Sequence, residues 1–127
     1  MTSIHLGLAI ASNQPHKLSE FYAFATNGEL CPGENEEHWR VTHENGMSVH
    51  LYKPSKNRPL PSSGSSAILC LSKGPTQDPL LSIREWLATL VSVGAIVDQQ
   101  PRVESFGAES WLKDPEGNYF LIFVPSL

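Results

Sequence analysis

The stretch DPEGNYFLIF, residues 114–123, joins a sharp turn to an apolar run near the end of the chain. Asp-Pro-x-Gly favours a tight turn, because proline fixes φ in its first half and glycine accepts positive φ in its second. The run from Asn118 to Phe123 is almost wholly apolar, which is typical of a strand covered on both faces. The stretch therefore predicts a turn and a buried strand, and the rest of the chain decides what they belong to.

The order of elements that ends in this strand occurs twice along the chain. Each half reads as a strand, a helix opened by proline and closed by glycine, a short strand, and two strands around a glycine turn. The first half predicts strands over 3–11, 29–31, 37–43 and 47–53, with a helix from Pro15 to Gly28 and an Asn-Gly hairpin turn at 44–46. The second half predicts strands over 67–72, 95–97, 107–113 and 118–123, with a helix from Pro79 to Gly94. The repeated order predicts an α+β fold of two βαβββ modules.

Length and composition fit one globular domain, since 127 residues with 40% hydrophobic and 17% charged residues can form a core. We divide it into module one at about 1–56, a Pro- and Ser-rich linker at about 57–65 and module two at about 66–127. A net charge of −4 without a basic stripe argues against nucleic acid as a partner. No apolar run approaches the ~20 residues of a membrane-spanning helix.

Two cysteines are too few for a disulfide scaffold, and the N-terminal residues lack the basic region of a secretory signal. We therefore expect a reduced, cytoplasmic protein. Cys70 lies in an apolar run, which predicts a small buried hydrophobic residue. His38 and His43 flank the hairpin turn, and we interpret both as surface residues.

Three stretches carry a resemblance to a known family: HLGLAI (5–10), LSEFYAFATNGEL (18–30) and FGAESWLKDPEGNYFLIF (106–123). With the repeated order of elements, the chain resembles the glyoxalase/bleomycin resistance/dioxygenase superfamily, also called vicinal oxygen chelate proteins. The resemblance implies tandem βαβββ modules that form a curved mixed-sheet half-barrel with an internal cleft. It also implies a homodimer. In enzymes of the superfamily, His, Gln or Glu from the first and last strand of each module hold a divalent metal.

In module one, two histidines match those ligand positions. His5 alternates with Leu6, Leu8 and Ile10, so it should point away from the apolar face of its strand. His50 shares one face of its strand with Ser48 and Tyr52. Imidazoles are plausible ligands for zinc, nickel or iron, so His5 and His50 are the metal candidates.

Module two breaks this pattern. Alignment of Ala9 with Cys70 places Ser66 at the position of His5, and serine is a poor ligand for these metals. Alignment of Gly46 with Gly117 places Leu121 at the position of His50, where the metalloenzymes of the superfamily carry glutamate. Leucine has no donor atom, so we expect no cofactor, although a substitute ligand such as Glu109 would leave a divalent metal possible.

Three functions follow, and the sequence leaves open whether the protein is an enzyme. The preferred one is a glyoxalase/bleomycin-resistance-like protein that binds a small molecule and has lost the metal site. Its candidate ligand-binding residues are His5, His50, Tyr52, Ser66, Trp111, Tyr119 and Leu121, whereas Phe123 is assigned to the core. The alternatives are a metal-dependent lyase, epimerase, dioxygenase or thiol transferase using His5 and His50, and a structural or interaction protein without a ligand.

Overall fold

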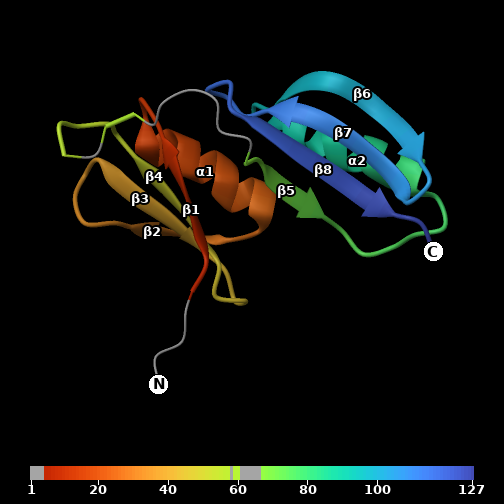
Figure 1. Ribbon diagram of the computed structural model, residues 1–127, viewed down its shortest axis with the longest axis horizontal. Coiled ribbons are helices and arrows are strands. Elements are labelled where there is room, and N and C mark those ends of the chain that lie inside the picture. Colours follow the sequence, from red (N-terminus) through yellow and green to blue (C-terminus); the bar gives the residue numbers. More distant parts are fainter. Residues whose placement is uncertain (1–4, 58, 61–66) are drawn as a thin grey trace. The chain divides into compact units, whose positions relative to one another are not determined.

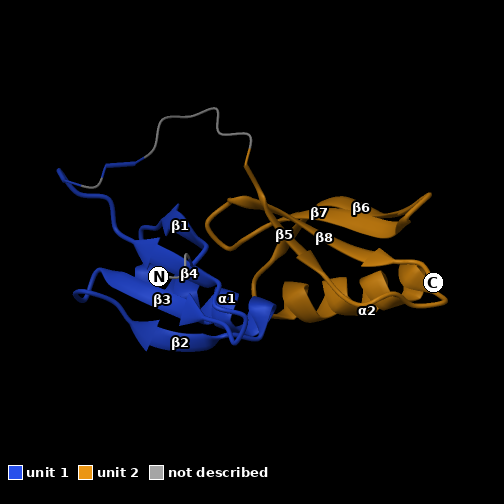
Figure 2. Ribbon diagram, turned by 60° about the horizontal axis from the view of Figure 1, so that its bottom comes forward, with its two compact units in different colours: residues 1–65 blue, residues 66–127 orange. Residues whose placement is uncertain are grey.

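The structure is a computed structural model that describes residues 5–57, 59–60 and 67–127. The chain divides into two compact units, residues 1–65 and 66–127, each of which is described by itself (Figures 1 and 2). Each unit is an open four-stranded mixed sheet with one helix packed on one of its faces. Within the described ranges, neither helix is long and apolar enough to cross a membrane.

Unit 1 contains β1 (Gly7–Ala11), α1 (Pro15–Thr26), β2 (Glu29–Pro32), β3 (His38–Thr42) and β4 (Ser48–Tyr52). Its strand order is β1-β4-β3-β2, with β1 parallel to β4 and the other pairs antiparallel. The core lies between α1 and the sheet and consists of Leu18, Phe21, Tyr22, Val41, Val49 and Leu51. We call the sheet face opposite α1 the open face of unit 1.

Unit 2 contains β5 (Leu69–Ser72), α2 (Pro79–Ser92), β6 (Ile96–Glu104), β7 (Gly107–Lys113) and β8 (Tyr119–Pro125). Its order, β5-β8-β7-β6, repeats that of unit 1, and β5 is again parallel to β8. Its core is formed by Ile83, Leu87, Leu90, Ala108, Leu112, Phe120, Ile122 and Val124. The predicted α+β fold with a twice-repeated βαβββ order is therefore confirmed. The open face of unit 2 is the sheet face opposite α2.

The DPEGN turn is held by its first residue. Asp114 is fully buried, and its carboxylate accepts hydrogen bonds from the backbone N–H groups of Glu116 (2.8 Å) and Asn118 (3.0 Å) and from the Asn118 side chain (2.8 Å). Gly117 has a φ of +90°, which a residue with a side chain adopts only with strain. These contacts explain why the turn needs Asp, Gly and Asn, because a buried charge is stable only when its oxygens are hydrogen-bonded.

Several predicted boundaries are corrected. The helix α1 ends at Thr26 and is capped by Asn27, which adopts the left-handed conformation at φ 54°, and not by Gly28. Gly28 is instead required by close packing, since a Cβ there would lie 2.5 Å from Val41 Cγ1. The predicted strand at 95–97 is nine residues long, because β6 continues as an edge strand to Glu104. Parts of the predicted first strand and linker, residues 1–4, 58 and 61–66, lie outside the described residues.

The apolar run at residues 118–123 is fully buried on one face only. Phe120, Ile122 and Val124 face α2 and are inaccessible, whereas Leu121 and Phe123 are half-buried on the open face. The assignment of Phe123 to the core is therefore wrong. Cys70 is also exposed and not buried, since the alternation of β5 places Leu69 and Leu71 on the more buried face and Cys70 opposite them.

Candidate functional site

The open face of unit 1 is organised by the hairpin of β3 and β4. Its register pairs residues that are equidistant from Asn45, so the pairs on the open face are His38 with Tyr52, Arg40 with His50, and Thr42 with Ser48. On the other side of β4, the parallel strand β1 places Gly7 beside Ser48 and Ala9 beside His50. The two small residues of β1 leave the polar side chains of β4 accessible from that edge.

A chain of hydrogen bonds runs across this face. The backbone N–H of Glu34 donates to His38 Nδ1 at 3.3 Å. His38 Nε2 lies 3.0 Å from His50 Nδ1, and His50 Nε2 lies 3.0 Å from Ser48 Oγ. The chain therefore connects the turn between β2 and β3 to a half-buried hydroxyl on β4, through two imidazole rings.

The interpretation of His38 as a surface residue is wrong. His38 is 7% exposed, and its ring occupies space left by Gly33, where a Cβ would lie 2.5 Å from His38 Cγ. The hairpin signal at Asn45-Gly46 contained the information needed to find it. Pairing about Asn45 makes His38 and His50 diagonal neighbours on one face, within reach of long side chains.

A hollow of about 790 Å³ lies at the end of the open face where His38 and Tyr52 are paired. It is lined by Glu34, Asn35, Glu36, Glu37, His38, Tyr52, Lys53, Pro54, Ser55 and Asn57. Tyr52 is buried, and its hydroxyl donates to the Pro59 carbonyl at 3.4 Å. Pockets for small molecules have volumes of roughly 300–1,000 Å³, so this hollow is large enough for one.

The structure does not bring His5 and His50 together. Ala9 is the residue of β1 that pairs with His50, whereas His5 precedes the first residue of β1, Gly7, and lies four residues before Ala9 in the sequence. His5 is exposed and lies over the hairpin turn, where a Cβ on Gly46 would be 3.3 Å from His5 Nδ1. The two predicted metal candidates therefore belong to different parts of unit 1.

The positions expected to hold metal ligands can be compared between the two units. β5 and β8 pair Cys70 with Leu121 as β1 and β4 pair Ala9 with His50, which confirms the predicted alignment of Leu121 with His50 and leaves no donor there. Both ring nitrogens of His50 are already hydrogen-bonded. Ser66 lies outside the described residues, and among the rest no group of three or more His, Cys, Asp or Glu residues is placed to hold a metal ion.

The open face of unit 2 carries the predicted ligand-binding residues Trp111, Tyr119 and Leu121. Trp111 pairs with Leu121, and both are half-buried there. Tyr119 is exposed at the end of β8, with the ammonium of Lys113 4.9 Å from its ring centroid. Trp111, Tyr119 and Leu121 thus share one face, which presents aromatic and apolar side chains.

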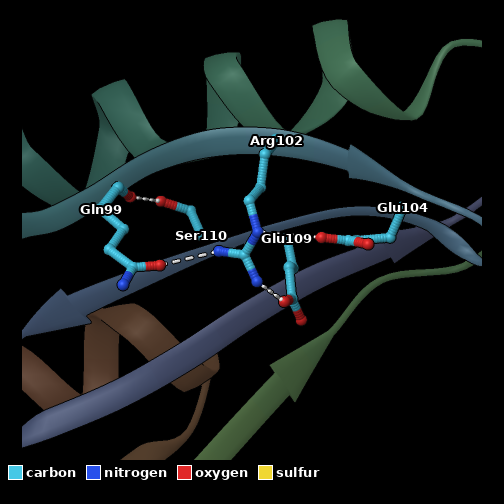
Figure 3. Close-up of polar contacts among 5 residues, drawn as sticks. All are labelled: Gln99, Arg102, Glu104, Glu109 and Ser110. Atoms are coloured by element: carbon cyan, nitrogen blue, oxygen red, sulfur yellow. Dashed lines mark hydrogen bonds and ion pairs between the residues drawn. The ribbon is translucent and has the colours of Figure 1, made fainter.

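A polar network borders this aromatic face (Figure 3). The guanidinium of Arg102 on β6 donates to Gln99 Oε1 at 2.8 Å, to Glu104 Oε1 at 2.9 Å and to the carboxylate of Glu109 on β7. Ser110 Oγ donates to the Gln99 carbonyl at 2.6 Å and so fixes the bulged part of β6. Glu109, the possible substitute ligand, is therefore engaged in an ion pair with Arg102.

Cys70 lies on the same face, and its thiol is weakly acidic. Although Cys70 is exposed as a residue, partial desolvation of its sulfur raises the pKa of the thiol above its ordinary value, and the carboxylate of Glu109 adds to this rise. A nucleophilic cysteine needs the opposite shift, because only the thiolate attacks. Cys70 is thus a neutral thiol at pH 7.

Comparisons with known proteins agree with this architecture. No protein-family model and no curated protein matches the sequence. Among solved structures, an antibiotic-binding protein from Streptomyces sp. CB03234 is 22% identical with a TM-score of 0.67, covering 98% of both chains. A glyoxalase/bleomycin resistance protein/dioxygenase family enzyme from Burkholderia phytofirmans PsJN is 16% identical with a TM-score of 0.68, covering 91% of this chain and 94% of its own. Lactoylglutathione lyase from Agrobacterium tumefaciens is 15% identical with a TM-score of 0.61, covering 97% and 94%. The chain therefore has the fold of the glyoxalase/bleomycin resistance/dioxygenase proteins, as its sequence predicted.

Proposed function

We propose that this protein is a member of the glyoxalase/bleomycin resistance superfamily that binds a small molecule on the open face of unit 1, without a metal. The observation that carries the proposal is the hollow of about 790 Å³ at which His38 and Tyr52 are buried side by side. Ligand pockets combine such a volume with aromatic side chains and a few fixed polar groups. The hydrogen-bond chain through His50 supplies those groups next to the hollow.

Binding is preferred over metal-dependent catalysis because of the register in unit 1. A metal held by His5 and His50 requires two imidazole nitrogens within about 2.1 Å of one ion. The four-residue offset of His5 from Ala9 and the two hydrogen bonds of His50 oppose that arrangement. One structural neighbour is described as antibiotic-binding, which supports a binding role for this fold without a reaction.

A thermal-shift screen of the chelator-treated protein tests the proposal. A ligand present at 100 times its Kd stabilises the folded state by about 2.7 kcal/mol, which raises the melting temperature measurably. We expect His50→Ala to abolish the shift of a hit and His5→Ala to preserve it. A metal site shared by the two histidines would instead lose binding in both variants, and binding restored only by added zinc, nickel or manganese would refute the proposal.

We also propose that the protein is a homodimer, on the basis of its family resemblance. Size-exclusion chromatography with light scattering should give twice the mass of one chain at micromolar concentration. A mass equal to one chain under the same conditions would refute the dimer and leave the binding proposal unaffected, because the residues that carry it all lie in unit 1.

A further inference from the structure

The direction of the hydrogen-bond chain on unit 1 follows from its first bond. A backbone N–H can only donate, so His38 Nδ1 must accept from Glu34 and carries no proton. The proton of the neutral His38 ring is then on Nε2, which donates to His50 Nδ1. In the same way His50 Nε2 carries a proton and donates to Ser48 Oγ. One backbone amide thus fixes the tautomer of both rings.

The chain ends on a hydroxyl whose own proton is directed away from the imidazoles. Ser48 Oγ accepts from His50, and among residues 5–57, 59–60 and 67–127 His50 is the only hydrogen-bond partner of this hydroxyl. Ser48 is half-buried on the open face beside Gly7, which has no side chain to cover it. The Ser48 O–H is therefore available as a donor to a bound molecule.

As a donor, the Ser48 hydroxyl pairs with an acceptor atom of a bound molecule. Arg40 on β3 does not contribute a charge there, because its Nε donates to the Pro32 carbonyl at 3.3 Å and so holds the side chain toward β2, on the side of β3 away from Ser48. The acidic side chains Glu34, Glu36 and Glu37 line the hollow at the opposite end, beside His38.

We infer that His38 is a positioning residue that turns the open face of unit 1 into a hydrogen-bond donor at Ser48, and that the face takes its ligand through an acceptor oxygen of a carboxylate, phenolate or carbonyl group. The inference rests on the proposed function and extends its ligand from the hollow at His38 and Tyr52 along β4 to Ser48, which does not line the hollow. It also assigns Ser48 a binding role and not a nucleophilic one. A serine nucleophile must give its proton to His50 Nε2, which here already carries one.

Two variants of His38 that are isosteric with each other, His38→Gln and His38→Glu, test the inference. His38→Gln places an amide N–H₂ where His38 Nε2 donates, so the chain keeps its direction. His38→Glu places a carboxylate there, which accepts from His50 Nδ1 and moves the proton away from Nε2. Ring ¹⁵N shifts of His50 report the tautomer directly, and we expect an Nε2–H ring in the wild type and in His38→Gln, and an Nδ1–H ring in His38→Glu.

Binding is measured with two probes of similar size, benzoate and benzylammonium, by ¹H–¹⁵N titration of the chelator-treated protein. We expect benzoate to shift the amides of Ser48 and His50 saturably in the wild type and in His38→Gln, and benzylammonium not to. His38→Glu should bind benzoate about tenfold more weakly or not at all, because a hydrogen bond to a charged group is lost. Ser48→Ala should lose benzoate binding to the same extent. Because this variant keeps both imidazoles, it tests the inference even if His38→Glu fails to fold.

An Nδ1–H tautomer of His50 in the wild type would overturn the inference, as would benzoate binding that Ser48→Ala leaves unchanged. The same holds if benzylammonium shifts these amides and benzoate does not. If the thermal-shift screen finds ligands that require His50 but carry no acceptor oxygen, the inference fails while the proposed function stands. If no ligand is found at all, the proposed function itself fails.

Discussion

Replacement of Asp114 by asparagine tests the contact that closes the DPEGN turn. The carboxylate accepts three hydrogen bonds, from two backbone amides and from Asn118 Nδ2, and it has no exposed surface. Asparagine retains one acceptor oxygen for the backbone amides but turns an N–H₂ group toward that of Asn118. The variant thus loses one charge-assisted hydrogen bond and weakens two.

The expected loss is about 3 kcal/mol. A hydrogen bond to a charged group contributes about 1.5–3 kcal/mol and a neutral one about 1 ± 0.5 kcal/mol, and the relief of burying a charge offsets part of the sum. Asn118→Ala removes one donor and keeps the carboxylate's two backbone bonds, so it should cost only about 1–2 kcal/mol. The two variants differ because Asp114→Asn also weakens the two backbone hydrogen bonds that Asn118→Ala leaves intact.

Urea unfolding followed by ¹H–¹⁵N spectra measures this loss in each unit. Amides of β7 and β8 should lose their native signals at a lower urea concentration in Asp114→Asn, whereas β3 and β4 serve as the control within the same sample. With a slope of about 1–3 kcal/mol per molar urea, 3 kcal/mol moves the midpoint by at least 1 M. A change of less than about 1 kcal/mol in unit 2, or one equal to that of Asn118→Ala, would refute the reasoning.

The remaining predictions concern a thiol and a glycine. In a Cys31→Ser background, the pH midpoint for alkylation of Cys70 should lie above 9.0, because partial desolvation and then the carboxylate of Glu109 raise the pKa of the thiol. The midpoint should fall in Glu109→Gln, and a midpoint at or below 9.0 in the parent protein contradicts this prediction. Gly33→Ala should displace His38, cost about 1–3 kcal/mol and change the ring ¹⁵N shifts of His50, since its Cβ would meet the imidazole at 2.5 Å. Gly74→Ala is the control, as a Cβ there has no neighbour within 4 Å, and equal effects of the two variants would count against the close contact at Gly33.

The fold was predictable because local chemistry and periodicity agree at each element. Pro79 and the Asp78 cap, which accepts from the Leu81 amide at 3.1 Å, begin α2 where expected. The two glycine turns also lie where the sequence predicts them, at Gly46 and Gly117, both with positive φ. The extent of β6 was not predictable in this way. It is an edge strand with mostly exposed residues and two register shifts, so it lacks an alternating apolar pattern.

The site was predictable only in part, because contacts across strands depend on register. Alternation within one strand places His50 and Tyr52 on one face of β4, and the hairpin turn places His38 on the same face of the sheet. His5 could not be placed relative to His50 from the sequence. β1 and β4 are parallel and joined through α1, β2 and β3, so no turn between them sets their register.

The central claim is that the open face of unit 1 binds a small molecule without a metal. The most direct test is a ¹H–¹⁵N titration of protein dialysed against chelator, using hits from the thermal-shift screen. The account predicts saturable shifts at Ser48, His50 and Tyr52 that are unchanged when zinc or nickel is added back. Hits that shift none of these amides, or that do so only after a metal is restored, would contradict it.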